Sequence, residues 1–391
     1  MEVIKNVFKN NIRQYAMVIA LVVIILFFQI KTNGVLLVPM NVTNLILQSS
    51  YVFILAIGMT VCILTGGNID LSVGSLCAFI GAIAGTLIIS MHMNIGLAIV
   101  IALLLGVAVG AWQGFWIAYI RIPAFIVTLA GMLIFRGLTV YMLKGLTLAP
   151  FPESFQRLSS GFVPDLFSGL GSEINLTAFF LGLIISGIYL FVEIRKRVIR
   201  KKSNLNVSST PFFIAQIIII LGAVNLLFYW LASDRGIPIA LILIVFLILV
   251  YSIFTTRTVP GRYLYAMGGN EKAAKLSGIN TNKVLFFAYV NMGALSAIAG
   301  MMFASRINSA SPQAGTNFEL DAIAACFIGG ASAYGGVGTV IGAIVGALVM
   351  GVLNNGMSIL GVGSDLQMTI KGLVLLTAVA FDVISKRRAR A

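Results

Sequence analysis

The segment from Asn270 to Gly278 has the residue types of a short helix that is capped at both ends. Asn270 is a favourable N-cap, Glu271 suits the positive end of the first turn, and Gly278 favours a C-terminal stop. A helix of about two turns is too short to be stable alone, so something must hold it. The chemistry that this segment predicts is docking.

One side of this helix is smooth, because Ala273 and Ala274 leave room for the groove of another protein. The alternative is a helix that lies on a membrane surface. Leu276 is its one large apolar residue, which is too little for a surface helix. The sequence therefore favours docking into a partner.

A second set of polar residues interrupts or borders strongly apolar stretches. Asn68 and Asp70 lie in a link with no room for a hydrophilic loop, and Asn354, Asn355 and Gln367 lie in or beside later apolar stretches. Buried amides and carboxylates are costly unless they are paired or face water. We expect these five residues to line a polar pathway. The alternative is that they satisfy backbone groups where helices break.

Composition decides which elements must position these residues. Of the 391 residues, 59% are hydrophobic and only 10% are charged, and the mean hydropathy is +1.04. A soluble fold has too little interior for so much apolar surface, and disordered chains are polar. The three cysteines have no metal-site spacing, so neither a disulfide, a metal site nor a cofactor is expected on this chain. The sequence predicts an all-α, polytopic membrane protein.

Apolar stretches of about 20 residues mark the helices that cross the hydrocarbon core. The sequence predicts about twelve of them. They lie near residues 15–30, 44–64, 73–90, 95–118, 122–143, 175–194, 211–232, 237–254, 285–304, 320–336, 339–359 and 366–384. All belong to one predicted transmembrane domain, 1–391, that contains an outer loop, 144–174, and a cytoplasmic loop, 255–284.

The basic residues orient these spans. With the N-terminus inside, the inner segments hold 19 Lys and Arg residues and the outer segments hold 5. Because cytoplasmic loops are enriched in Lys and Arg, both termini are predicted to be cytoplasmic. The net charge of +14 is thereby explained without a nucleic-acid partner.

Glycines recur at four-residue spacing within the predicted spans. Three such groups are Gly81 and Gly85; Gly106, Gly110 and Gly114; and Gly338, Gly342 and Gly346. Glycine at this spacing lets helix backbones approach closely in a bilayer. The groups predict a tightly packed bundle and carry no information about a substrate.

Several motifs in order resemble the permease subunits of ribose/xylose/galactose-type sugar ABC importers. The stretch GRYLYAMGGNEKAAKLSGIN from Gly261 is similar to their coupling loop. The resemblance continues in GGNIDLSVGS from Gly66, IPAFIVTLAGMLIFRG from Ile122 and SPQAGTNFELDAIAACFIGG from Ser311. It ends with GVLNNGMSILGV from Gly351 and KGLVLLTAV from Lys371. The resemblance therefore covers nearly the whole chain.

The resemblance implies the architecture and the site. The ten-helix family core would carry two extra helices, because three apolar stretches precede the coupling loop where compact members have one. This long form resembles the xylose and multiple-monosaccharide branch. The residues that would contact the ATPase are Gly268, Gly269, Asn270, Glu271, Ala273, Ala274 and Gly278.

The resemblance also implies the partners. These are a second copy of the chain, a cytoplasmic ATPase with two nucleotide-binding domains, and an extracytoplasmic sugar-binding protein, at the bacterial cytoplasmic (inner) membrane. The chain has no Gly-Lys dipeptide and so no Walker A loop. It is therefore predicted not to be an enzyme, with ATP and Mg bound by the separate ATPase.

The sequence leaves one alternative function, a proton-coupled secondary sugar transporter. Such a transporter needs ionisable relays within its spans, whereas the acidic residues here lie almost wholly at predicted span ends. It also leaves the capped helix at Glu271 unexplained. The sequence does not indicate which sugar would cross.

Overall fold

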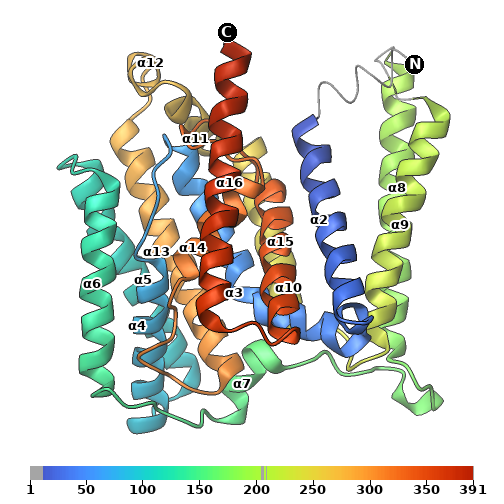
Figure 1. The fold of residues 1–391 in the computed structure, drawn as a ribbon, viewed down its shortest axis with the longest axis horizontal. Coiled ribbons are helices and arrows are strands. Elements are labelled where there is room, and N and C mark those ends of the chain that lie inside the picture. The colour runs from blue at the N-terminus through green and yellow to red at the C-terminus, as the bar shows by residue number, and fades with distance from the viewer. Residues whose placement is uncertain (1–11, 204–206, 208, 391) are drawn as a thin grey trace. The chain divides into compact units, whose positions relative to one another are not determined.

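The computed structural model describes residues 12–203, 207 and 209–390, and the elements within them are helical, with two isolated β-bridges. The all-α prediction is confirmed (Figure 1). In chain order the helices are α2 (Ile12–Lys31), η1 (Val35–Leu37), α3 (Pro39–Leu64), α4 (Val73–Gly85), η2 (Thr86–Ser90), α5 (Ile95–Ala118), α6 (Ala124–Leu143), α7 (Glu153–Ser160), η3 (Ser168–Leu170), α8 (Leu176–Lys202), α9 (Thr210–Ala232), α10 (Ile239–Arg257), α11 (Val259–Gly269), α12 (Glu271–Leu276), α13 (Thr281–Ile307), α14 (Phe318–Ile328), α15 (Val340–Ile359) and α16 (Ser364–Arg390).

Among the described residues, ten helices are long and apolar enough to cross a membrane. They match ten of the twelve predicted spans. The predicted span at 15–30 corresponds to α2, whose described apolar part, Met17–Lys31, is shorter than the others. The span count of twelve stays a prediction.

The predicted span at 320–336 is wrong in its extent. The helix there, α14, has only 11 residues and ends at Ile328. Gly329 packs so closely on the Gly342 backbone that an added Cβ would meet it at 2.5 Å or less, and Gly330 has a left-handed φ of +81°. The chain then runs without helix to residue 339.

The chain divides into two compact units. The main unit contains the described residues up to 36, residues 45–160 and those from 240 onward. Within it, the start of α2, the end of α16 and α12 lie at one end, and α7 lies at the opposite end (Figure 1). This arrangement agrees with the predicted common side of the termini and the 255–284 loop. Which side is cytoplasmic stays a prediction, and the basic residues Lys5 and Lys9 lie outside the described part.

The second unit contains residues 37–44 and 161–239. Its two long helices, α8 and α9, form an antiparallel hairpin in which Asn225 Nδ2 donates to Ser186 Oγ at 2.8 Å. Asp165 accepts hydrogen bonds from the Thr177 hydroxyl at 2.7 Å and from backbone N–H groups at the start of α8. These bonds, with that from Phe167 N, lower the pKa of Asp165. The carboxylate therefore fixes the start of α8.

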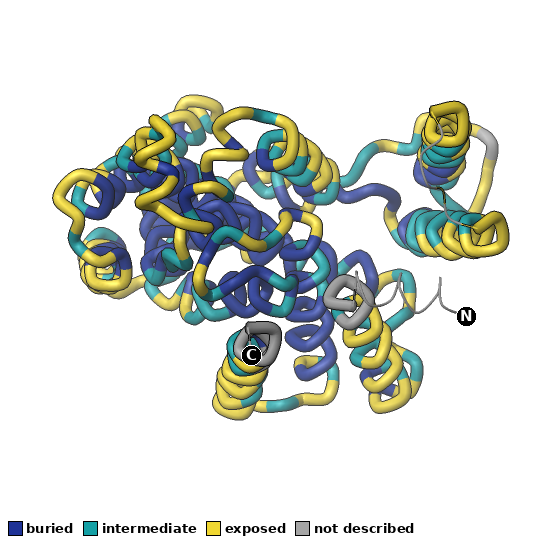
Figure 2. Tube along the Cα trace, turned by 90° about the horizontal axis from the view of Figure 1, so that it is seen from above, coloured by how far each residue is buried: buried dark blue, intermediate teal, exposed yellow. Residues whose placement is uncertain are grey.

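Glycine contacts hold the interior of the main unit together. Gly106 and Gly110 of α5 face α13, where an added Cβ would overlap its backbone, and Gly293 of α13 faces back toward both. Gly346 of α15 packs in the same way on Ala325 of α14. The predicted close packing is confirmed at these interfaces. Figure 2 shows how burial concentrates inside the main unit while the surfaces of the outer helices stay exposed.

Two alanine substitutions test this packing. Gly110→Ala would push a Cβ into the Tyr289 carbonyl of α13, so we expect a loss of about 1–3 kcal/mol in the free energy of unfolding. The control is Gly137→Ala in α6, where nothing lies within 4 Å of the added Cβ. The control should be neutral or stabilising by up to about 1 kcal/mol. The measurement is thermal unfolding of the purified protein in detergent. Equal midpoints for both variants would contradict the packing account.

Candidate functional site

The predicted capped helix is present as α12. Asn270 Oδ1 accepts a hydrogen bond from Ala273 N at 3.0 Å, which is the expected N-cap. Gly278 ends the helix with a left-handed φ of +84°, and Ile279 N donates to the Ala274 carbonyl at 3.1 Å. Nothing lies within 4 Å of a Cβ built at Gly278, so its φ rather than space requires glycine there.

The two alanines of α12 do not share one outward side. Ala274 is buried and packs inward, whereas Ala273 is exposed. The prediction of a smooth side built from both alanines is therefore wrong. The exposed surface instead includes Lys272 and Leu276, and Leu276 is 91% exposed. Leu276 is the large apolar side chain that α12 presents to solvent.

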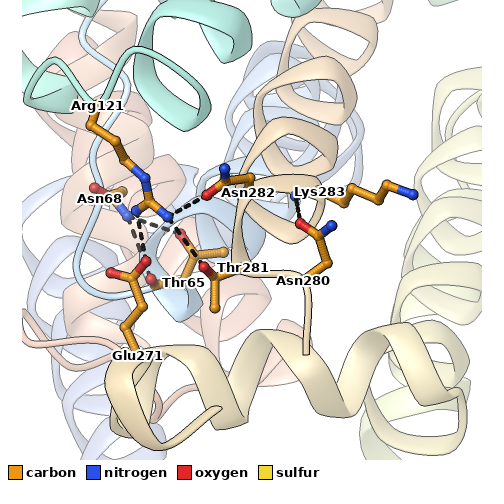
Figure 3. A network of polar contacts seen from close by, with 8 residues as sticks. All are labelled: Thr65, Asn68, Arg121, Glu271, Asn280, Thr281, Asn282 and Lys283. Carbon is orange, nitrogen blue, oxygen red and sulfur yellow. Dashed lines mark hydrogen bonds and ion pairs between the residues drawn. The ribbon is translucent and has the colours of Figure 1, made fainter. Parts of the chain in front are cut away.

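Glu271 holds α12 to the bundle through Arg121 (Figure 3). Arg121 lies in the turn between α5 and α6, and its Nη1 is 2.6 Å from Glu271 Oε1. The same guanidinium donates to Thr281 Oγ1 at 3.1 Å and to Asn282, both in the first turn of α13. One arginine therefore joins three elements: α12, the α5–α6 turn and α13. This pairing could not be predicted from the sequence, in which Arg121 is a single basic residue in a short turn.

Gly268 brings the end of α11 against the bundle. A Cβ built there would overlap the Leu64 carbonyl oxygen at the end of α3, and it would also meet the backbone of Gly336. Gly336 N itself donates to the Leu64 carbonyl at 3.1 Å. Gly269, by contrast, has nothing within 4 Å of an added Cβ. Gly268 therefore has no room for a side chain at this three-way backbone contact, whereas Gly269 has room for one, although a Cβ built at Gly336 would meet the Gly269 backbone N at 2.7 Å.

A tyrosine of α11 reinforces that contact. The Tyr265 hydroxyl donates to the Gly338 carbonyl at 3.0 Å, and burial raises the pKa of its phenol. The segment 329–338, which follows the short helix α14, is thus attached to α11. Because α14 ends at Ile328, this segment has no helix and its backbone is available to contact α11.

The predicted pathway residues Asn68 and Asp70 lie in the link between α3 and α4. Asp70 is 1% exposed, and its Oδ1 accepts from Ser72 N at 2.8 Å and from Ser72 Oγ at 2.6 Å. Gln113 Nε2 of α5 donates to the same hydroxyl at 2.7 Å. Asn68 donates to Thr65 Oγ1 at 3.1 Å and is drawn in the network of Figure 3. These bonds are those expected of residues that shape a helix break.

Asn354 belongs to a different cluster in which Asp321 is the centre. Asp321 of α14 is 1% exposed and pairs with Lys371 Nζ of α16 at 3.0 Å. Tyr51 of α3 donates its hydroxyl to Asp321 Oδ2 at 2.8 Å, and Asn354 Nδ2 lies 3.4 Å from the same oxygen. Four helices therefore meet at one buried carboxylate.

The other two predicted pathway residues differ in position. Asn355 is buried, and its Nδ2 donates to Gln48 Oε1 of α3 at 3.3 Å. Gln367 bonds only locally in what the structure describes, from Nε2 to the Val362 carbonyl at 2.8 Å. No hydrogen bond among the described residues joins the Asp70 link to the Asp321 cluster. Tyr51, Asp321 and Lys371 were not among the predicted site residues, although a lysine within an apolar span demands a buried acidic partner.

Comparisons with known proteins show which sequences this chain is similar to. The family described as branched-chain amino acid transport system / permease component matches residues 41–379. The chain is 39% identical over 386 residues to the xylose transport system permease protein XylH of Escherichia coli (strain K12), covering 97% of this chain and 94% of that protein. It is 39% identical to XylH of Haemophilus influenzae, covering 97% and 98%. The ribose import permease protein RbsC of E. coli K12 is 37% identical, covering 88% and 85%. No solved structure matches.

The Asp321–Lys371 pair gives a direct test of the interior. Lys371→Met leaves a buried carboxylate without its cation, so we expect a loss of about 3–5 kcal/mol in the free energy of unfolding. Adding Asp321→Asn should recover most of that loss, because the remaining groups are neutral. Lys31→Met, at the exposed end of α2, is the control and should change little. Thermal unfolding in detergent measures all three. Additive losses in the double variant would show that the pair is not coupled.

Proposed function

Because the chain belongs to the family of branched-chain amino acid transport system permease components, we propose that it is the permease subunit of an ATP-driven, binding-protein-dependent importer of monosaccharides. The family description speaks of amino acids, whereas the relatives above are named for xylose and ribose. The substrate class that they support is a pentose.

The observation that carries this proposal is the extent of the xylose-type match. It covers 97% of the chain, whereas the ribose-type match covers 88%. Near-complete coverage includes the α8–α9 hairpin, which belongs to the stretch of three helices, α8 to α10, where we expect compact members to have one. A xylose-type pentose is therefore the substrate we propose.

The coupling site that we propose is the surface from Gly268 to Gly278. The ATPase, which would bind ATP and Mg, would contact α12 on its exposed side, where Leu276 and Ala273 lie. Motion of α12 would pass through Glu271 and Arg121 to α5, α6 and α13. A second route leads from Gly268 to α3 and to the segment 329–338. Rigid-body displacement is favoured over bending, because these contacts are short and the helices are closely packed.

The translocation pathway is proposed along the polar residues of the bundle. The Oδ1 atom of Asn354 is buried and has no hydrogen-bond partner among the described residues, so it could accept a sugar hydroxyl. Asn68, Asp70 and Asn355 supply further polar groups. Gln367 would take part only if its local bond to the Val362 carbonyl opened. A homodimer, with an extracytoplasmic binding protein delivering the sugar, completes the proposed assembly.

One observation favours a second candidate function. The sequence had placed the acidic residues near span ends, yet Asp321 and Lys371 form a buried ion pair between helices. Such a pair is the kind of relay that a proton-coupled transporter uses. The two functions differ in their energy source, which a transport assay separates.

The experiment is xylose uptake by proteoliposomes that contain the permease, its ATPase and its binding protein. We expect uptake to require ATP and the binding protein and to survive a protonophore. Ribose should compete more weakly than unlabelled xylose. Uptake that a protonophore abolishes while ATP remains would support the secondary transporter instead.

The coupling site is tested in the same assay with two matched charge reversals. Glu271 and Glu153 are both exposed and paired with an arginine, at 2.6 and 2.8 Å. An exposed pair contributes at most about 1 kcal/mol to stability, so neither reversal should unfold the protein. Glu271→Arg should lower uptake at least about tenfold, since a misplaced charge at an interface costs several kcal/mol. Glu153→Arg, on α7 at the other end, should leave it unchanged. Normal uptake by both variants would remove coupling from α12.

A further inference from the structure

Two non-helical segments enter the bundle of the main unit from opposite ends. Segment 65–72 follows Leu64, whose carbonyl contacts the end of α11 next to α12, and it leads into α4. Segment 308–317 begins at the α7 end, where Asn308 Oδ1 accepts a hydrogen bond from Phe151 N at 2.7 Å, and it leads into α14. Non-helical backbone at membrane depth is tolerated only where protein buries it or where it lines a water-filled cavity. Both segments therefore belong to the bundle interior or to a pathway through it.

Helix α6 shows how far the two segments reach. A Cβ built at Gly131, about two turns from the end of α6 nearer α12, would lie 3.3 Å from the Ser72 Cβ. About two turns from the other end, Arg136 Nη1 donates to the carbonyls of Pro312 at 2.8 Å and Ala314 at 2.7 Å. Two turns span roughly 11 Å of a helix that is roughly 30 Å long. Both segments therefore reach the middle part of α6.

The two segments meet through glycine backbones. A Cβ built at Gly74, in the first turn of α4, would overlap the Gly315 carbonyl oxygen, and one built at Gly315 would overlap that of Gly74. Gly315 also has a left-handed φ of +70°. Because no side chain fits between these two backbones, their contact closes the space between the segments. We call this contact of Gly74 with Gly315 the constriction.

The Glu319 carboxylate lies at the constriction. Its Oε2 would also overlap a Cβ built at Gly74, and the side chain is half-buried in the first turn of α14. In the described part of the chain it makes no ion pair, and no hydrogen bond except with its own backbone N–H. The other carboxylates nearby, Asp70 and Asp321, are engaged by the partners described above. Glu319 therefore keeps acceptor capacity that no other residue uses.

The charges around Glu319 favour a neutral ligand. Arg136 is close enough to attract the carboxylate, while Asp70 and Asp321 are close enough to repel it. The three carboxylates disfavour an anion. No group of three or more acidic, His or Cys side chains among the described residues could hold a metal ion. An ionised carboxylate accepts hydrogen bonds through two oxygens, so it suits two neighbouring hydroxyls of a sugar.

We propose that Glu319 is a sugar-binding residue at the constriction, where its carboxylate accepts hydrogen bonds from two neighbouring hydroxyls of the monosaccharide. This inference rests on the proposed function of the chain as a sugar permease. It adds to that function a specific contact that the pathway residues named above do not include. Passage of the sugar then requires Gly74 and Gly315 to separate.

Glu319→Gln tests the contact in the reconstituted importer. The variant keeps the size of the side chain and removes the charged acceptor. We expect xylose uptake to fall about tenfold or more, as for the loss of one charge-assisted hydrogen bond. ATP hydrolysis stimulated by the binding protein should persist, because α12 and its contacts are unchanged.

The matched control is Glu153→Gln on α7, which removes the same charge from an exposed carboxylate and should leave uptake unchanged. Equal uptake by the two variants would overturn the proposal. A loss of ATPase stimulation or a lower unfolding midpoint in Glu319→Gln would make Glu319 a structural residue, and would overturn it as well.

Chemical protection tests the contact in the unmodified full-length permease without its partners. A water-soluble carbodiimide activates accessible carboxylates, and glycinamide then forms a stable amide that mass spectrometry locates. We expect saturating xylose to reduce the modification of Glu319 several-fold and to leave that of Glu153 unchanged. Betaine at the same osmolarity, which has no hydroxyl group, should protect neither.

The protection experiment has two contrary outcomes. Absent modification of Glu319, or modification that xylose does not change, would overturn the proposal. Protection by sodium chloride and not by xylose would assign the carboxylate to a cation instead.

The proposed function and the Glu319 contact fail in different ways. Failure of the proposed function appears as no ATP-dependent xylose uptake by the unmodified complex. Failure of the contact appears in a complex that does take up xylose, as unchanged uptake by Glu319→Gln. The protection experiment tests the contact in either case, because it requires neither ATP nor a partner protein.

Discussion

The main unit depends on backbones that touch where a side chain would prevent contact. Gly106 and Gly110 let α5 meet α13, and Gly268 lets the end of α11 meet the end of α3. In a bilayer, helices gain no hydrophobic advantage from packing against each other, so close backbone approach replaces it. The contact at Gly268 has a second consequence. It connects the helices of the 255–284 loop to the bundle without a flexible linker.

An ion pair between Glu271 and Arg121 adds a second connection between the loop and the bundle. Arg121 reaches this carboxylate and the first turn of α13 at the same time, so α12 is attached to the bundle on two sides. The ion pair is exposed and therefore weak as a source of stability. Its value lies in orientation, because it fixes how α12 presents Leu276 to solvent. A helix of six residues keeps its shape here only because the bundle holds it.

Much of this fold could be predicted from the sequence, and the failures have physical causes. Span length and glycine spacing are local properties, so ten spans and the close packing at Gly106 and Gly110 were predictable, whereas the partner helix α13 was not. The cap at Asn270 is local too. The early end of α14 could not be predicted, because it depends on the contact of Gly329 with Gly342 of α15. The sequence stays apolar beyond residue 328 and so predicted a longer helix. The Arg121–Glu271 and Asp321–Lys371 pairs join residues far apart in the chain, so sequence spacing cannot reveal them. The burial of Ala274 depends on how α12 packs in the folded protein, which the sequence of the helix alone does not specify.

The central claim is that the exposed side of α12 contacts the ATPase. A photoreactive residue at position 276, where the leucine side chain is 91% exposed, tests it directly in membranes that contain the assembled complex. The control is position 141 at the end of α6, where the tyrosine is 81% exposed. The account predicts a cross-linked adduct with the ATPase from position 276, with a yield that changes when ATP is added, and none from position 141. No adduct from position 276 in a complex that transports sugar would contradict it.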